Sequence, residues 1–209
     1  MKLAAGLLIG AALSSVFTYP AAAQRETAAA PSKQAVTAMH NFSRCVVDRG
    51  NKGAAEVLAM DYRTMEYGDA LRKLALGFDH CAPGAELRFN GLLFAGGLAE
   101  RMLVQARGAR SLADLLAYDA SKPPVQARDE GEMTALCTAR KAPQQLQLLL
   151  ETDPASKEEA SAIKSLQPVI ASCLGRGQQM RLNAPGLRSL LALGAYRLMQ
   201  HNRSQSSES

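Results

Sequence analysis

The chain has 209 residues, of which 47% are hydrophobic, and a mild formal net charge of +5 at pH 7. Charged residues recur throughout, which excludes a second membrane-spanning segment after the N-terminal apolar stretch. There is no tryptophan and there are only five phenylalanines. A core must therefore be built from Leu, Ala, Val, Ile and Met, a composition that favours helices. The length allows one or two domains.

The N-terminus has the three parts of a secretory signal peptide. Lys2 gives a positive start, an apolar stretch covers residues 3–16, and a small-residue site of the A-x-A type precedes Gln24. We predict cleavage before Gln24, which places the protein in the periplasm or outside the cell. The alternative is a retained membrane anchor, but the apolar stretch is shorter than the roughly 20 residues that span a bilayer.

The rest of the chain repeats itself with an offset of 92 residues. Cys45 and Cys81 are 36 positions apart, and so are Cys137 and Cys173. Because the hydrophobic pattern keeps the same offset, we predict an all-α fold of two tandem, internally duplicated helical units of about four helices each. The predicted organisation is a signal peptide (1–23), a flexible leader (24–34), a first unit (35–105), a linker with a short helix (106–126), a second unit (127–201) and a disordered tail (202–209).

The four cysteines are expected to form disulfides, because an exported chain meets an oxidising compartment. Four cysteines allow three pairings, and the duplication selects one of them: if each unit once folded alone, its two cysteines pair internally. We predict Cys45–Cys81 and Cys137–Cys173, each worth about 4 kcal/mol in the chain-entropy treatment. No C-x-x-C spacing and no recurring histidine accompany them, so we expect no metal and no cofactor.

The first helix of each unit is followed by a short second one. In the first unit, Gly50-Asn51 is predicted to end the first helix, and the second passes through residues 54–58. Its counterpart in the second unit is 143–150, with Pro143 in the first turn. Apolar residues recur at helical spacing along the first helix, namely Ala35, Met39, Phe42 and Val46. In the linker, a small amphipathic helix is expected to carry Ser111 as its cap and Leu112, Leu115 and Leu116.

The third helix of each unit begins at a hydroxyl cap, Thr64 in one and Ser156 in the other. Glu159 completes the order of a capping box, so we interpret Glu158-Glu159 as helix capping and not as a catalytic carboxylate pair. Pro168 is expected to kink or shorten the second version. The apolar stripe places both cysteines on the buried side of their helices. It matches at the offset of 92: Ala70 with Ala162, Leu71 with Ile163, Leu74 with Leu166, Phe78 with Ile170 and Cys81 with Cys173.

A four-residue signature precedes the last helix of each unit. It contains Arg88 and Asn90 in the first unit and Arg181 and Asn183 in the second. We expect the asparagines to cap the last helices. Each arginine is interpreted as forming a hydrogen bond or salt bridge that holds the turn against its own unit. Alternatively, the two arginines are equivalent contact points for a partner. The last helices then match at an offset of 97, and each carries a central glycine that predicts a close approach of helices, namely Gly97 and Gly194.

These features resemble a group of exported alphaproteobacterial proteins of the sphingomonad type. No activity is known for that group of proteins. The resemblance rests on Cys45-Val46-Val47, on the acidic capped helix that ends in Cys81, and on Leu87-Arg88-Phe89-Asn90 followed by Leu98-Ala99-Glu100. The second unit departs from this pattern, with Cys137-Thr138-Ala139 and Tyr196-Arg197. The resemblance implies a bacterial, periplasmic setting and assigns no catalytic residue.

Candidate catalytic groups do not recur between the units. His40 corresponds to Glu132, and His80 corresponds to Ser172. His80-Cys81 could form a thiol–imidazole pair, but that requires a free Cys81, which the duplication predicts to be bonded. The sequence contains no nucleophile elbow, zinc-protease motif, phosphate-binding loop or dinucleotide fingerprint. We therefore predict that the protein is not an enzyme.

The C-terminal part is basic, with six basic residues and no acidic one between positions 160 and 207. Arg176, Arg188 and Arg197 are therefore candidates for weak contact with an anionic surface such as envelope lipid. The alternative is a solvated face whose arginines bond the carbonyl ends of helices. Nucleic acid is not expected as a partner, because no aromatic stacking residues are interleaved with the charges.

The sequence thus predicts a non-catalytic periplasmic or secreted helical protein that binds a protein or an envelope component, without a transmembrane segment once the signal peptide is removed. A periplasmic stress chaperone is the first alternative, and dye binding that rises steeply at low pH would favour it. An enzyme without a recognisable motif is the second alternative. A deep pocket lined by polar groups common to both units would favour the enzyme.

Overall fold

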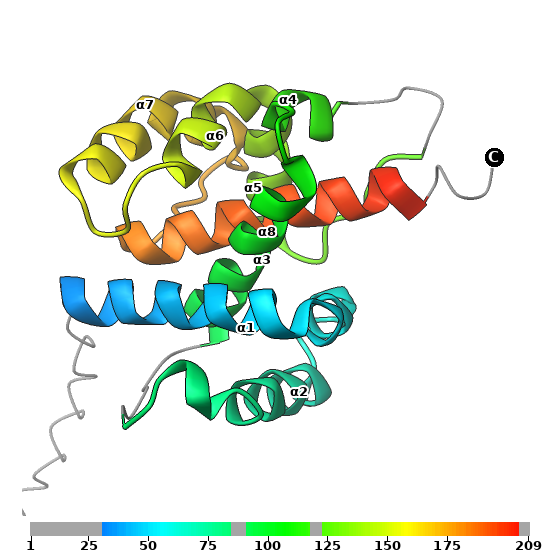
Figure 1. The fold of residues 1–209 in the computed structure, drawn as a ribbon. Helices are drawn as coiled ribbons and strands as arrows, with labels where there is room; N and C mark the ends of the chain where they lie inside the picture. Colours follow the sequence, from blue (N-terminus) through cyan, green and yellow to red (C-terminus); the bar gives the residue numbers. More distant parts are fainter. Residues whose placement is uncertain (1–30, 85–90, 118–122, 205–209) are drawn as a thin grey trace, which may run out of the picture.

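The computed structural model describes residues 31–84, 91–117 and 123–204 (Figure 1). The predicted signal peptide, Arg88 and Asn90 lie outside the described residues. Within the described residues every regular element is a helix and no strand occurs. The elements are α1 (Lys33–Ala59), α2 (Met65–Leu76), the 3-10 helix η1 (Asp79–Cys81), α3 (Gly91–Arg107), α4 (Leu112–Leu115), α5 (Glu130–Lys141), α6 (Pro143–Leu150), α7 (Lys157–Cys173) and α8 (Ala184–Ser204).

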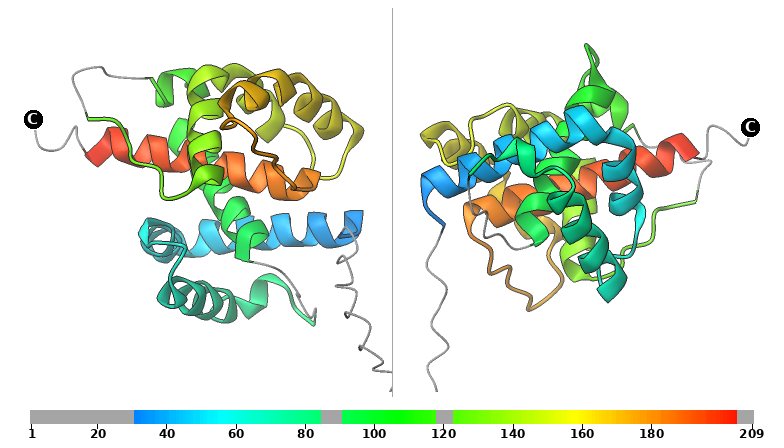
Figure 2. Two further views of the ribbon diagram at one scale, coloured as in Figure 1. Left: turned by 180° about the vertical axis from the view of Figure 1, so that it is seen from behind. Right: turned by 60° about the horizontal axis from the view of Figure 1, so that its bottom comes forward.

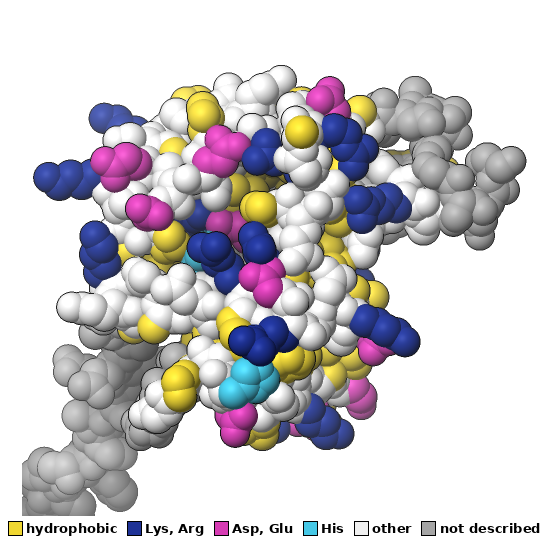
Figure 3. Space-filling view, in the orientation of Figure 1, with side chains coloured by type: hydrophobic (Ala, Val, Ile, Leu, Met, Phe, Trp, Pro, Cys, Tyr) yellow, Lys and Arg dark blue, Asp and Glu magenta, His cyan; other side chains and the backbone are white. Residues whose placement is uncertain are grey.

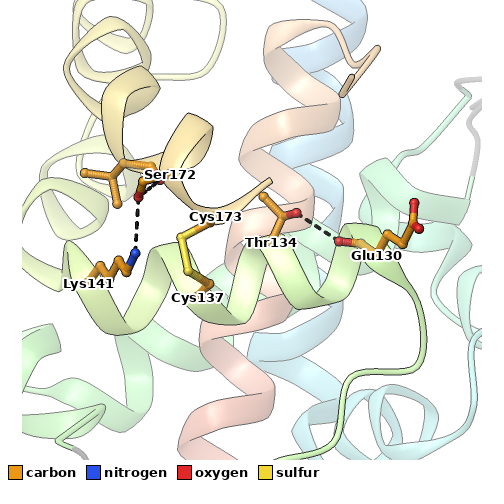
Figure 4. Close-up of a disulfide and its surroundings, with 7 residues drawn as sticks. Glu130, Thr134, Cys137, Lys141, Ser172 and Cys173 are labelled. Carbon is orange, nitrogen blue, oxygen red and sulfur yellow. Dashed lines mark hydrogen bonds between the residues drawn. A yellow bond between two sulfur atoms is a disulfide. The ribbon is translucent and has the colours of Figure 1, made fainter. Parts of the chain in front are cut away.

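Two disulfide-stapled helical units make up the fold, as predicted. In the unit from α1 to α3, which we call unit 1, Cys45 is bonded to Cys81 with an S–S distance of 2.00 Å. In the unit from α5 to α8, called unit 2, Cys137 is bonded to Cys173 at 2.01 Å. Figure 4 shows the second bond joining α5 to the end of α7. The all-α class and both cysteine pairings are therefore confirmed.

The break between the first two helices is equivalent in the two units. Gly50 leaves the helical conformation inside α1, with φ −140° and ψ 43°. Ala142, which is 92 residues further on, separates α5 from α6 with φ −135° and ψ 51°. A Cβ atom at Gly50 would lie 2.2 Å from Cζ of Phe78. Glycine is thus required in unit 1 because the Phe78 ring packs directly against the bend.

The helix caps agree with the prediction in part. The hydroxyls of Thr64 and Ser156 accept hydrogen bonds from the N–H of Tyr67 at 3.2 Å and of Glu159 at 3.0 Å. Glu159 does not return the bond to the Ser156 N–H, because one carboxylate oxygen accepts from Ala155 N at 2.8 Å and the other faces a buried arginine described below. The capping-box interpretation of Glu159 is therefore incomplete. The reciprocal box lies in α4, between Ser111 and Asp114.

The boundaries of several helices differ from the prediction. Pro168 does not shorten α7, which continues through it to Cys173. Instead, α2 is the short one: it ends before Gly77, so that half-buried Cys81 lies in η1 and not on a long helix. At the ends, α1 begins two residues inside the predicted leader, after the cap Ser32, and α8 extends through 204 into the predicted tail.

The last helix of each unit packs closely on the first helix at the predicted glycines. A Cβ atom at Gly97 would lie 2.5 Å from Oγ of Ser43, and one at Gly194 would lie 2.7 Å from Cβ of Ala135. Ser43 and Ala135 are themselves 92 residues apart. The predicted close approach is confirmed, and it joins equivalent positions in the two units.

The two units are packed together by α3 and α8, which cross in the centre of the molecule between α1 and the α5–α7 layer (Figure 2). The crossing is tight, because a Cβ atom at Gly96 would lie 2.2 Å from Cβ of Ser189. A single hydrophobic core extends across both units. Among the described residues, none of the helices is long and apolar enough to cross a membrane. The most deeply buried large side chains include Val46, Phe94, Leu98, Leu166, Leu191 and Met199.

Candidate functional site

Two clefts lie between the units, and equivalent parts of the chain build them. Each is formed by the first and last helices of one unit and by one loop of the other unit. In unit 1 this loop follows the part of α1 beyond Gly50, and in unit 2 it follows α6. The apolar groove lies between α5 and α8 of unit 2 and residues 58–64 of unit 1, with α2 along its side. The polar cleft lies between α1 and α3 of unit 1 and residues 150–156 of unit 2. The two loops are again 92 residues apart.

The apolar groove has a volume of about 850 Å³. This volume is within the range of roughly 300–1,000 Å³ found for small-molecule sites, which are mostly apolar with a few polar groups. Residues 174–182, which precede α8, extend its wall. The apolar part of the lining comes from both units and includes Leu58, Tyr67, Leu71, Ala95, Leu190 and Leu193.

Polar contacts at one edge of the groove tie the two units together. The Tyr62 hydroxyl donates to Oδ2 of Asp129 at 2.6 Å, and the guanidinium of Arg128 lies over the Tyr62 ring at 5.5 Å. Arg63 donates to the carbonyl of Arg128 at 2.9 Å. Burial, followed by the hydrogen bond to Asp129, raises the pKa of Tyr62 well above its usual value. The phenol therefore remains a hydrogen-bond donor at any physiological pH.

The polar cleft, of about 640 Å³, opens onto a buried ionic network. Arg188 donates to Glu100 through Nη2 at 2.6 Å and through Nε at 2.8 Å. Its Nη1 also donates to Oε1 of Glu159 at 3.1 Å. On the cleft side, Nε2 of His40 lies 3.0 Å from Oε1 of Glu100. Four elements, α1, α3, α7 and α8, thus supply one titratable side chain each.

The electrostatics of this network favour the ionised form of Glu100. Burial acts to raise the pKa of Glu100, but the hydrogen bonds from Arg188 and the close contact with His40 outweigh it and leave that pKa below its ordinary value. Arg188 also donates to the carbonyls of Leu150 at 3.1 Å and of Thr152 at 3.0 Å. A buried guanidinium with this many acceptors is well satisfied, as a buried charge must be.

The structure corrects the expected role of Arg188. Its side chain is only 5% exposed, so it cannot contact an anionic surface. Its carboxylate partners come from 88 and 29 residues away in the sequence. It has no counterpart in unit 1, where the position at offset 97 is Gly91. The sequence feature that could have indicated this role is the basic segment between positions 160 and 207, which contains no acidic residue. A buried arginine in such a segment needs carboxylate partners from other parts of the chain.

The other predicted site residues have separate roles. Arg197 is half-buried, forms an ion pair with Glu132 and donates to the carbonyl of Gln126 at 2.7 Å. Asn183 accepts from Gly186 N at 2.9 Å and so caps the start of α8, as predicted. Arg176 and Arg181 are exposed, and Arg181 lines the apolar groove. Figure 3 shows basic and acidic side chains close together where the units meet, without a segregated basic face in that view.

The predicted chemistry of the cysteines and histidines is also clarified. Cys81 is disulfide-bonded, so the thiol–imidazole pair with His80 does not exist. His80 is an exposed residue beside that disulfide. Among the described residues, no group of three or more His, Cys, Asp or Glu side chains is arranged to hold a metal ion.

The comparisons with known proteins add no assignment. No protein-family model matches the chain, and neither does a curated protein or a solved structure. The two clefts therefore have to be interpreted from their geometry.

Proposed function

We propose that the protein is an exported, non-catalytic binding protein whose apolar groove holds an apolar part of a cell-envelope component. The observation that carries this proposal is the groove itself, a recess of about 850 Å³ with a mainly apolar lining between two disulfide-stapled units. The disulfides indicate an oxidising compartment. The predicted signal peptide at residues 1–23 would deliver the chain there.

The polar cleft supports a structural role better than a catalytic one. Catalytic acid–base pairs need a group that can gain and lose a proton in contact with a substrate. Glu100 is instead neutralised by Arg188 at 2.6 and 2.8 Å. The positions equivalent to His40 and Glu100 in unit 2 hold Glu132 and Arg197, which form an ion pair. A pair that recurs in place but changes in chemistry is best explained as a clamp between the first and last helices.

Photo-crosslinking in the native compartment tests this proposal. A photoreactive amino acid replaces Leu182, which lines the groove and is 40% exposed. The control position is Leu148 on α6, which is 61% exposed and outside the groove. The full chain is secreted with its own signal peptide in a Gram-negative host and irradiated. We expect a defined crosslinked product from position 182 and none from position 148.

Equal crosslinking from both positions, or none from position 182, would contradict the proposed function. The same preparation also checks export, because mass spectrometry should find Gln24 as the first residue. A chain that begins at Met1 in the cytoplasmic fraction would exclude an envelope role.

A further inference from the structure

We propose that the apolar groove binds a single-chain amphiphile with an anionic headgroup, the chemistry shared by a free fatty acid and a lysophospholipid. This inference rests on the proposed function and names the class of ligand that the groove accepts.

The depth of the apolar side chains favours a slender chain over a protein helix. Leu71 is 4% exposed and Ala95 is 1% exposed, while Leu190 and Leu193 are half-buried. Of the large hydrophobic residues that line the groove, only Leu182 is strongly exposed. A partner helix docks through side chains that project to meet it. An acyl chain can instead enter a recess, where each buried CH₂ contributes about 0.8 kcal/mol.

The charges around the groove favour an anionic headgroup. Four arginines line it, and two of them are engaged: Arg72 with Asp69 at 2.9 Å, and Arg197 with Glu132. For the other two, Arg128 and Arg181, no carboxylate lies within ion-pair distance among the described residues. Guanidinium groups without a carboxylate partner are suited to bind a carboxylate or phosphate in two-pronged fashion.

The carboxylates that line the groove are mostly committed elsewhere. Glu132 is paired with Arg197, and Asp129 accepts from the Tyr62 hydroxyl at 2.6 Å and from Glu132 N at 2.8 Å. Glu130 is exposed in the first turn of α5, where the helix dipole favours a negative charge. The lining thus contains four arginines and three carboxylates, which leaves one net positive charge beside the groove.

Tyr67 provides a hydroxyl donor in the wall of the groove. Burial raises the pKa of Tyr67 to about 12, so its hydroxyl keeps its proton. Among the described residues this hydroxyl has no hydrogen-bond partner, although the side chain is 9% exposed and lines the groove. A headgroup oxygen or a bound water can accept its hydrogen bond.

Gly68 allows the groove to be filled without disturbing the backbone. It lies within α2 and lines the groove, and a Cβ atom added there meets no atom within 4 Å. Gly68→Phe should place its ring in the groove. Gly68→Ala is the matched control, because it leaves the groove open and favours the helix.

The test is displacement of the fluorescent fatty acid cis-parinaric acid from the oxidised mature protein. We expect palmitate to displace the probe at least tenfold more effectively than hexadecanol, which has the same chain without the charge. Gly68→Phe should weaken probe binding at least tenfold, and Gly68→Ala less than twofold. Arg128→Gln and Arg181→Gln should each weaken palmitate several-fold and leave hexadecanol unchanged. Preference for lysophosphatidic acid over palmitate would identify a phospholipid headgroup as the source.

Two results would overturn this inference. If palmitate and hexadecanol compete equally and the arginine variants behave like the wild type, the headgroup is not recognised. If the probe binds equally to Gly68→Phe, it does not occupy the groove. A crosslink from position 182 to a protein, with no amphiphile bound, would refute the ligand class and leave the proposed function standing. Loss of both crosslinking and probe binding would refute both.

Discussion

In both units a polar pair joins the first and last helices at the same place, but the carboxylate of the pair lies on opposite helices. In unit 1 the first helix carries His40 and the last carries Glu100, 3.0 Å apart. In unit 2 the first helix carries Glu132 and the last carries the cation, Arg197. The comparison shows that the fold determines where the pair lies, while either of the two helices can carry the carboxylate. Only the pair in unit 1 is extended into a network between the units, because Arg188 lies behind Glu100.

The largest difference in stability between the two pairs should appear when Arg188 is removed. Arg188→Met leaves Glu100 and Glu159 buried without their cation, and breaking such a network costs about 3–5 kcal/mol in the free energy of unfolding. Arg197→Met should cost less, because the Arg197 side chain is 25% exposed and water can replace it. Urea denaturation of both variants checks the difference. Equal losses would mean that burial does not distinguish the clamps. The triple variant with Glu100→Gln and Glu159→Gln should recover part of the stability.

The disulfides should contribute equally, since both close loops of the same length, with a sequence separation of 36. Replacement of either cysteine pair by serine should lower the free energy of unfolding by about 2–4 kcal/mol. Thermal denaturation of the two double variants measures the effects side by side. A difference larger than about 1 kcal/mol would show that the surroundings of the bonds, and not loop closure, determine their contribution.

The central glycines test whether the two helix crossings are equally tight. Gly97→Ala and Gly194→Ala should each destabilise by about 1–3 kcal/mol through overpacking. The effect should be larger at Gly194, because the new methyl group would meet backbone carbon of Ala135 at 2.9 Å as well as its Cβ. At Gly97 the nearest atoms belong to the Ser43 side chain. Urea midpoints of the two variants check the order, and the reverse order would show that the first helix of unit 2 moves more easily.

Acid should act on unit 1 through Glu100, and we expect the smallest effect here. The folded protein lowers the pKa of this carboxyl below its ordinary 4.5. Its contribution to stability is therefore present above pH 4.5 and lost as the pH falls through the folded-state pKa. Urea midpoints measured from neutral pH downwards should decrease in this window, and more for the wild type than for Glu100→Gln. A parallel decrease in both proteins would assign the acid sensitivity to other groups.

The sequence predicted the features that are local or that recur between the units. The cysteine pairs, the caps at Thr64 and Ser156, and Gly97 and Gly194 all belong to this class. Each can be checked within one helix or against its counterpart at a fixed offset. Recurrence between the units argues against a role for His40, which occurs once, and it gives no indication that Arg188 is buried. The residues that matter most for the polar cleft are the ones that the duplication does not share.

The clefts themselves could not be predicted because they lie between the units. Their walls depend on how α3 and α8 cross, and that crossing is set by the close contact of Gly96 with Ser189, 93 residues apart. Helical periodicity identifies which face of a helix is buried but not which helix covers it. The sequence offers Arg181 as a contact point for the turn or for a partner, but its position at the apolar groove depends on the tertiary structure.

Each disulfide joins a cysteine to the next cysteine along the chain. A polypeptide that enters an oxidising compartment with its N-terminus first can therefore close the Cys45–Cys81 bond before Cys137 has entered. An oxidase that joins cysteines in the order of their arrival produces the native pairing directly. The protein should consequently mature in a host that has such an oxidase but lacks an isomerase to reshuffle wrong pairs.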